Sequence, residues 1–89
     1  RGDVELDAAG HYGRLNGKDV TLTPTEYALL ELFMRNPGRV FTRDNLLSSV
    51  WGYDFAGDEK TVNIHIMNLR RKLGAGIIET VRGVGYRLG

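Results

Sequence analysis

The chain has 89 residues, the size of one small domain, and its 42% hydrophobic and 26% charged residues place it among globular rather than disordered chains. It contains no cysteine, which excludes disulfides and thiolate-bound metals. No apolar run approaches the ~20 residues of a membrane helix, and no apolar segment typical of a signal peptide is present, so we expect a cytoplasmic protein with no membrane partner. Such a small domain without a catalytic cluster is expected to be one module of a longer protein.

Residues 3–22 predict a small antiparallel sheet. Their apolar residues come in short, roughly alternating runs. Asn16 and Gly17 fit a two-residue hairpin turn, because both residue types accept a positive φ. Residues 8–10 predict a second turn.

Two helices follow this sheet. Thr23 is a suitable N-cap, and Glu26 three residues later completes a capping box. This first helix should end at 36–38, which contain asparagine, proline and glycine. A short extended link then leads to a second helix, capped by Thr42 and ending at Gly52.

A third helix and a hairpin complete the chain. Asp58 is the expected cap of the helix, which runs to Leu73 with acidic residues in its first turn and basic ones in its last. Residues 77–81 and 84–88 are predicted to form the two strands of the hairpin, with Arg82 near its tip. The sequence therefore predicts an α+β fold.

Charge is strongly polarised along the chain. Residues 60–88 contain six basic side chains and one acid, a formal charge of +5. Residues 1–59 contain six basic and ten acidic side chains, a charge of −4. A basic helix and hairpin on an otherwise acidic domain is typical of a surface that binds a polyanion.

The third helix has two different faces. At 100° per residue, one narrow apolar stripe is predicted to face the core: Val62, Ile66, Leu69 and Leu73. The opposite side mixes cationic, polar and apolar side chains: Lys60, Thr61, Ile64, Met67, Asn68 and Arg71. Solvated surface charge, a DNA major groove and a protein partner would each explain this mixture, so the face alone does not decide between them.

Several motifs occur together in an order that resembles a known family. They are Leu22-Thr23-Pro24-Thr25-Glu26-Tyr27, Leu29-Leu30, Arg39-Val40-Phe41-Thr42-Arg43, Leu46-Leu47, Val50-Trp51, Thr61-Val62-Asn63-Ile64-His65-Ile66, Leu69-Arg70-Arg71-Lys72-Leu73 and Thr80-Val81-Arg82-Gly83-Val84-Gly85-Tyr86. This arrangement resembles the output domains of OmpR/PhoB-type response regulators from about residue 4 onward.

The resemblance implies a winged helix-turn-helix with a four-stranded N-terminal sheet, three helices and a C-terminal hairpin wing. The third helix would enter the DNA major groove, with Thr61, Ile64 and Asn68 as candidate base contacts. Further DNA contacts are expected at Lys60, Asn63, His65, Met67, Arg70, Arg71 and Thr80, and Arg82 would enter the minor groove. For His65, a packing role competes evenly with a phosphate contact. The loop after the second helix would touch RNA polymerase through Gly52, Tyr53, Asp54, Phe55, Ala56, Gly57, Asp58 and Glu59.

The expected function is sequence-specific binding of double-stranded DNA as the output domain of a two-component response regulator that controls transcription. Its partners would be DNA, RNA polymerase, the receiver domain of the full-length protein and a second copy on tandem sites. No cofactor or metal is expected. An enzyme is disfavoured, because Ser48 and Ser49 have no paired base or acid in the sequence. The alternative is a winged-helix protein-interaction module that uses Ile64, Met67 and the 52–59 loop.

Overall fold

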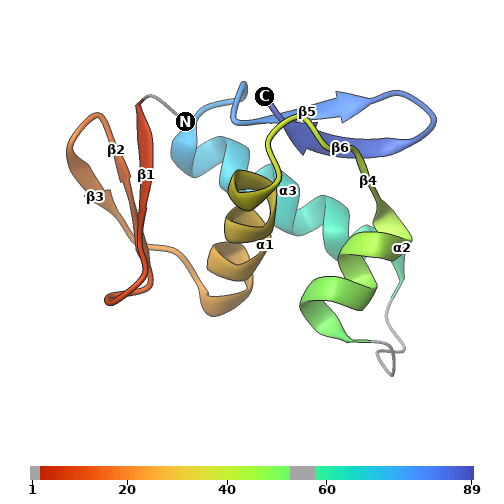
Figure 1. Ribbon diagram of the computed structural model, residues 1–89, viewed down its shortest axis with the longest axis horizontal. Helices are drawn as coiled ribbons and strands as arrows, with labels where there is room; N and C mark the ends of the chain where they lie inside the picture. Colours follow the sequence, from red (N-terminus) through yellow and green to blue (C-terminus); the bar gives the residue numbers. More distant parts are fainter. Residues whose placement is uncertain (1–2, 53–57) are drawn as a thin grey trace.

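The computed structural model describes residues 3–52 and 58–89, and Figure 1 shows their arrangement. The elements in chain order are β1 (Val4–Asp7), β2 (Tyr12–Leu15), β3 (Lys18–Val20), α1 (Pro24–Arg35), β4 (Phe41–Thr42), α2 (Arg43–Leu46), η1 (Leu47–Trp51), α3 (Glu59–Leu73), β5 (Ile78–Val81) and β6 (Gly85–Leu88). The N-terminal sheet lies at one end of the molecule, and α2 and the β5–β6 wing lie at the other, with α3 running between them (Figure 1). This order confirms the α+β winged-helix prediction.

The N-terminal sheet is antiparallel, with the strand order β1-β2-β3. Asn16 and Gly17 have φ values of 52° and 83°, as the predicted hairpin turn requires. The family resemblance implied four strands in this sheet. That prediction is wrong, because three strands pair in it among the described residues. The extended segment before α1 contains Thr23, whose backbone N–H donates to Glu26 Oε1 (3.0 Å). This N–H therefore caps α1 and is not available to pair with a strand.

All three predicted N-caps are present. Thr23 and Thr42 each form a capping box, with Glu26 and Asn45 respectively. Asp58 caps α3 by accepting a hydrogen bond from the backbone N–H of Lys60 (3.0 Å). Among the described residues, none of these helices is both long and apolar enough to cross a membrane.

The second predicted helix is irregular. It begins as one α-helical turn, α2, and continues as a wider π-helical segment, η1. The wider turn closes where the N–H of Gly52 donates to the carbonyl of Leu47 (3.0 Å). Gly52 has a φ of 101°, which a residue with a side chain rarely adopts, so the helix ends where the sequence predicted.

The wing hairpin belongs to a second antiparallel sheet, ordered β4-β6-β5. The segment expected only to link two helices therefore pairs as β4, with Phe41 opposite Tyr86 and Thr42 opposite Gly85. The two strands lie very close together here. A Cβ atom added at Gly85 would lie only 1.9 Å from the carbonyl oxygen of Phe41. A glycine is needed at this crossing.

A single hydrophobic core joins both sheets to the helices. The stripe predicted for α3 is confirmed, since Val62, Ile66 and Leu69 are fully buried and Leu73 nearly so. Buried residues from the other elements complete the core: Val4, Leu22, Tyr27, Leu29, Leu30, Phe33, Phe41, Leu46, Ile77, Ile78 and Tyr86. The inner side of α3 is thereby fixed, and its opposite side faces solvent.

Candidate nucleic-acid interface

The exposed side of α3 forms one line of four residues. After the first residue of the helix, its exposed side chains are Lys60, Ile64, Met67 and Arg71. Their spacing of four, three and four positions keeps them on one side of the helix. Ile64 and Met67 are 57% and 65% exposed, whereas the other large apolar residues of α3 are buried. We call these four residues the α3 stripe.

Asn63 lies beside the α3 stripe and is bonded within the protein. Its Oδ1 accepts hydrogen bonds from Nε of Arg43 (3.0 Å) and from the hydroxyl of Tyr86 (2.7 Å). These bonds connect α3 to α2 and to β6. The sequence predicted Asn63 as a DNA contact and gave no indication of this role, because its partners lie 20 and 23 positions away.

Arg70 connects α3 to the wing. Its Nε and Nη2 donate to the carbonyl oxygen of Ile78 (3.0 and 2.8 Å), and Nη2 also donates to the Thr80 hydroxyl (2.8 Å). The guanidinium carbon lies 5.7 Å from the centre of the Tyr86 ring. Two predicted DNA contacts, Arg70 and Thr80, are therefore bonded to each other in the free domain.

His65 packs against Trp51, which belongs to η1. Its Nδ1 lies 2.7 Å from the carbonyl oxygen of Thr61, and its ring meets Trp51 edge to face at 5.2 Å. Because a carbonyl oxygen only accepts, Nδ1 is the ring nitrogen with the proton in this bond. The packing role expected for His65 is present, and Nε2 is left as its second polar atom.

A buried ion pair anchors the C-terminal half of α3 to α1. Nζ of Lys72 lies 2.5 Å from Oε1 of Glu26, whose side chain is only 3% exposed. Burial by itself would raise the pKa of the Glu26 carboxyl, but the hydrogen bonds from Lys72 and from the Thr23 N–H outweigh it. The pKa of Glu26 is therefore lower than its ordinary value. Lys72 therefore stabilises the fold, and it is not counted among the cations that could bind an external partner.

The wing presents one cation in its turn. Arg82 is exposed in the turn between β5 and β6, where Gly83 has a φ of 75°. Neighbouring Val84 is 49% exposed. Arg87, on β6, is instead paired across the hairpin with Glu79 (3.0 Å). Of the two wing arginines, only Arg82 forms no hydrogen bond or ion pair with the described residues.

The predicted RNA polymerase loop is only partly described. Gly52 closes η1, Asp58 caps α3, and Glu59 is exposed in the first turn of that helix. The predictions for Tyr53, Asp54, Phe55, Ala56 and Gly57 lie outside the described residues.

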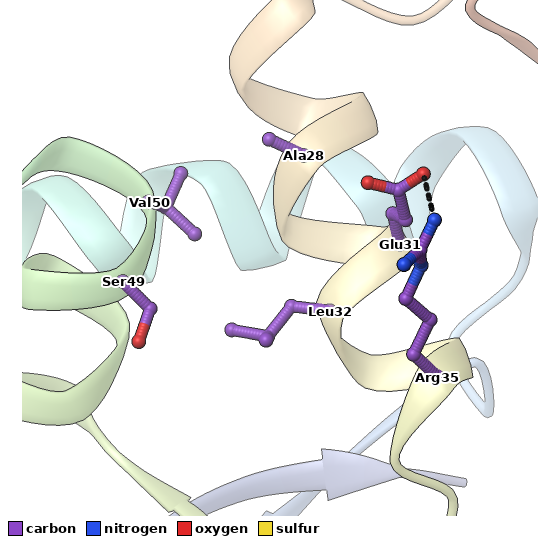
Figure 2. A pocket seen from close by; sticks show the side chains of 6 residues that line it. All are labelled: Ala28, Glu31, Leu32, Arg35, Ser49 and Val50. Carbon is purple, nitrogen blue, oxygen red and sulfur yellow. Dashed lines mark hydrogen bonds and ion pairs between the residues drawn. The ribbon is translucent and has the colours of Figure 1, made fainter. Parts of the chain in front are cut away.

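A hollow of about 210 Å³ lies between α1 and η1, and none of the α3 stripe residues lines it (Figure 2). Leu32 and Val50 line it from opposite sides, and Ser49 lies next to Val50. Glu31 and Arg35 form an ion pair at its edge (3.4 Å). No histidine is among the described residues that line it beside Ser49.

The sequence places the chain in a defined class of protein. Residues 17–88 match the family model described as "Transcriptional regulatory protein, C terminal". The chain belongs to this family, the C-terminal effector domains of OmpR/PhoB-type response regulators. The resemblance seen in its motifs is confirmed.

Two curated relatives illustrate the similarity. The chain is 47% identical over 91 residues to the phosphate regulon transcriptional regulatory protein PhoB of Rhizobium meliloti, covering 98% of the chain and 40% of that protein. It is 52% identical over 80 residues to the alkaline phosphatase synthesis transcriptional regulatory protein SphR of Synechococcus elongatus, covering 84% of the chain and 31% of that protein. The chain therefore spans less than half the length of these relatives.

Solved structures agree with the fold. The DNA-binding domain of Bacillus subtilis CssR superposes with a TM-score of 0.88 at 32% identity, covering 97% of the chain and 99% of that domain. The DNA-binding domain of the response regulator AdeR, solved in complex with an intercistronic region, gives 0.85 at 33% identity, covering 97% and 93%. These matches confirm the winged-helix fold.

Proposed function

We propose that this domain binds double-stranded DNA sequence-specifically, as the output domain of a two-component response regulator that controls transcription. Helix α3 enters the major groove, and the wing reaches the adjacent minor groove. The observation that carries the proposal is the α3 stripe, whose two cations flank two exposed apolar residues on a helix buried along its opposite side. The family membership and the AdeR–DNA complex support it.

On α3 and the wing, as far as the structure describes them, three cations are available to DNA without breaking an internal contact. Lys60, Arg71 and Arg82 are exposed and form no ion pair with the described residues. By contrast, Lys72 and Arg87 are paired with carboxylates. The first three supply the electrostatic attraction, because neutralising phosphates releases counterions from DNA.

The base contacts are assigned to the outer side of α3. Thr61, Ile64 and Asn68 face the base edges, where an amide can pair with adenine and an aliphatic group can touch thymine. Four residues stabilise this surface through bonds within the protein: Asn63, His65, Arg70 and Thr80. Their remaining polar atoms can contact the DNA backbone. Arg82 inserts into the minor groove, whose negative potential is strongest where the groove is narrow.

Other partners belong to the full-length protein. The relatives extend well beyond the matched region, so a receiver domain is expected in the parent chain. RNA polymerase is the proposed partner of the 52–59 loop. Two copies would occupy tandem sites about one DNA turn apart. The cytoplasm is the compartment in which these partners meet.

The salt dependence of binding tests this assignment. Two cations at phosphates, Lys60 and Arg71, and one in the minor groove, Arg82, together displace counterions, so log affinity should fall against log salt with a slope of about −2.7. Arg71→Gln should reduce that slope by about 0.9, because it removes one phosphate contact. Fluorescence anisotropy with a labelled duplex would measure both values.

Arg87→Gln is the matched control, since it removes the same charge from a residue already paired with Glu79. Its slope should stay close to that of the parent. A flat salt response in the parent would contradict DNA binding. Together with capture of a protein through Ile64 and Met67, it would favour the protein-interaction alternative.

A further inference from the structure

We propose that Ile64 and Met67 contact the methyl groups of thymines, so that the DNA target of this domain has thymines at neighbouring base pairs beneath the middle of α3. The inference rests on the proposed function and extends it from DNA in general to a class of DNA site. The occupant of this apolar surface would be the floor of the major groove.

The exposure of these two residues is unusual for this chain. The large apolar side chains that the structure describes as exposed are Ile64, Met67 and Val84, and Val84 lies on the wing. The neighbouring apolar residues of α3 are buried. Contiguous exposed apolar surface on a helix indicates a surface that becomes covered.

The positions of the charges indicate what covers it. Lys60 and Arg71 are eleven positions apart, a rise of about 16 Å along the helix. The major groove is about 12 Å wide, so side chains at the two ends of this span can reach phosphates while the middle faces base edges. An apolar centre between two cations is complementary to the groove.

The apolar centre fits thymine better than the other bases. Ile64 and Met67 are separated by about 4.5 Å along the helix, about 1 Å more than the ~3.4 Å spacing of adjacent base pairs, so their side chains can reach neighbouring pairs. In the major groove, the thymine C5-methyl is the apolar group, whereas guanine and adenine present nitrogen and oxygen atoms. A contact between an aliphatic side chain and this methyl removes apolar surface from water.

Guanine recognition from the same two turns is disfavoured. It commonly uses an arginine or lysine aimed at O6 and N7. Arg70 is the cation nearest the middle of the stripe in sequence, and its guanidinium is bonded to the Ile78 carbonyl and the Thr80 hydroxyl. Asn68, next to Met67, supplies an amide suited to adenine. The side chains in the middle of α3 are therefore better suited to contact A·T pairs than G·C pairs.

Replacing thymine with uracil tests this directly, because it removes the methyl group and keeps base pairing. A duplex bound by the 89-residue chain would first be selected from a random pool. Each thymine would then be replaced singly by deoxyuridine. We expect weakening of about four-fold at one or two neighbouring positions, the effect of one buried methyl-sized group.

The side chains are assigned by variants. Ile64→Ala should abolish the uracil effect at one position and Met67→Ala at the other. Val84→Ala, which shortens the exposed apolar residue on the wing, should leave both effects intact. Circular dichroism would check that all three variants remain folded.

The outcomes separate this inference from the proposed function. A selected site without thymines under α3, or uracil duplexes bound as tightly as the parent, would overturn the inference while leaving DNA binding in place. A uracil effect that persists in both α3 variants would overturn it as well. Failure to enrich any duplex would instead refute the proposed function.

Discussion

Asn63 is the residue that joins three elements, α2, α3 and β6, beside the α3 stripe. One side-chain oxygen accepts from both Arg43 and Tyr86. Asn63→Ala should therefore lower the free energy of unfolding by about 1–2 kcal/mol, because two donors lose their acceptor. Urea denaturation would measure the loss.

Tyr86→Phe provides the matched partner variant, because it removes the hydroxyl and keeps the ring. If the bond is formed, the stability losses of the two single variants should add up to more than the loss in the double variant, because each single change already breaks the same bond. Strictly additive losses would show that the Tyr86 hydroxyl does not bond to Asn63 in solution.

Glu26 gives the domain a defined response to acid. Its folded-state pKa is lower than the ordinary value of 4.5, so the unfolded chain binds its proton more readily than the folded domain does. The stability it contributes is present above pH 4.5 and is lost as the pH falls through the folded-state pKa. Glu26→Gln should cost about 2 kcal/mol at pH 7, the scale of a charge-assisted hydrogen bond.

Urea denaturation at several pH values between 7 and 3 checks the sign. Between pH 5 and 3, the variant should lose less stability than the parent, because the titrating group is gone. Glu79→Gln is the control, since that carboxylate belongs to an exposed pair with Arg87. An equally steep loss in the parent and in Glu26→Gln would contradict this role of Glu26.

Local chemistry made many residues predictable. The capping box at Thr23, the N-cap at Thr42 and the turn at Asn16 each involve partners no more than three residues apart, so a short stretch of sequence contains both partners. The bonds of Asn63 and Lys72 cross 20 to 46 positions. Such contacts depend on how the elements pack, which composition and spacing do not specify.

At the scale of elements, α3 and the wing act as one unit through Arg70. Its guanidinium spans the gap from the helix to the Ile78 carbonyl and the Thr80 hydroxyl. Arg70→Ala should weaken DNA binding and also lower the stability of β5, because the wing loses its attachment to the helix.

Arg71→Ala is the natural comparison, since the neighbouring Arg71 is exposed and forms no ion pair with the described residues. It should weaken DNA binding while leaving stability within about 0.5 kcal/mol of the parent. Amide hydrogen exchange across β5 would distinguish the two. Unchanged protection of β5 in Arg70→Ala would show that Arg70 does not hold the wing.

The elements themselves were largely predictable, and their exceptions have physical causes. Periodicity identified the buried and exposed sides of α3, because both depend on 3.6 residues per turn. The π-helical form of η1 ends with a bond from the N–H of Gly52 to the carbonyl of Leu47, and the pairing of β4 with β6 requires the close approach at Gly85. Neither has a local sequence pattern.

At the scale of the whole molecule, charge and architecture divide the domain into two parts. The acidic residues 1–59 supply the first sheet, α1 and α2, whereas the basic residues 60–88 supply nearly all of α3 and the wing. Four of the basic side chains in residues 60–88 can be sorted by what they bond. Lys72 and Arg87 hold carboxylates, and Arg71 and Arg82 remain exposed. The charge polarity of the sequence thus indicates the proposed binding surface, but only the packing shows which cations are available to it.

The central claim is that the outer side of α3 and the wing turn lie directly against duplex DNA. A heteronuclear NMR titration of the domain with its selected duplex tests this most directly. We predict that the largest shift changes fall on Lys60, Ile64, Met67, Asn68, Arg71 and Arg82, with little change across β1–β3. Large changes confined to the N-terminal sheet or to the hollow between α1 and η1, with α3 unaffected, would contradict the claim.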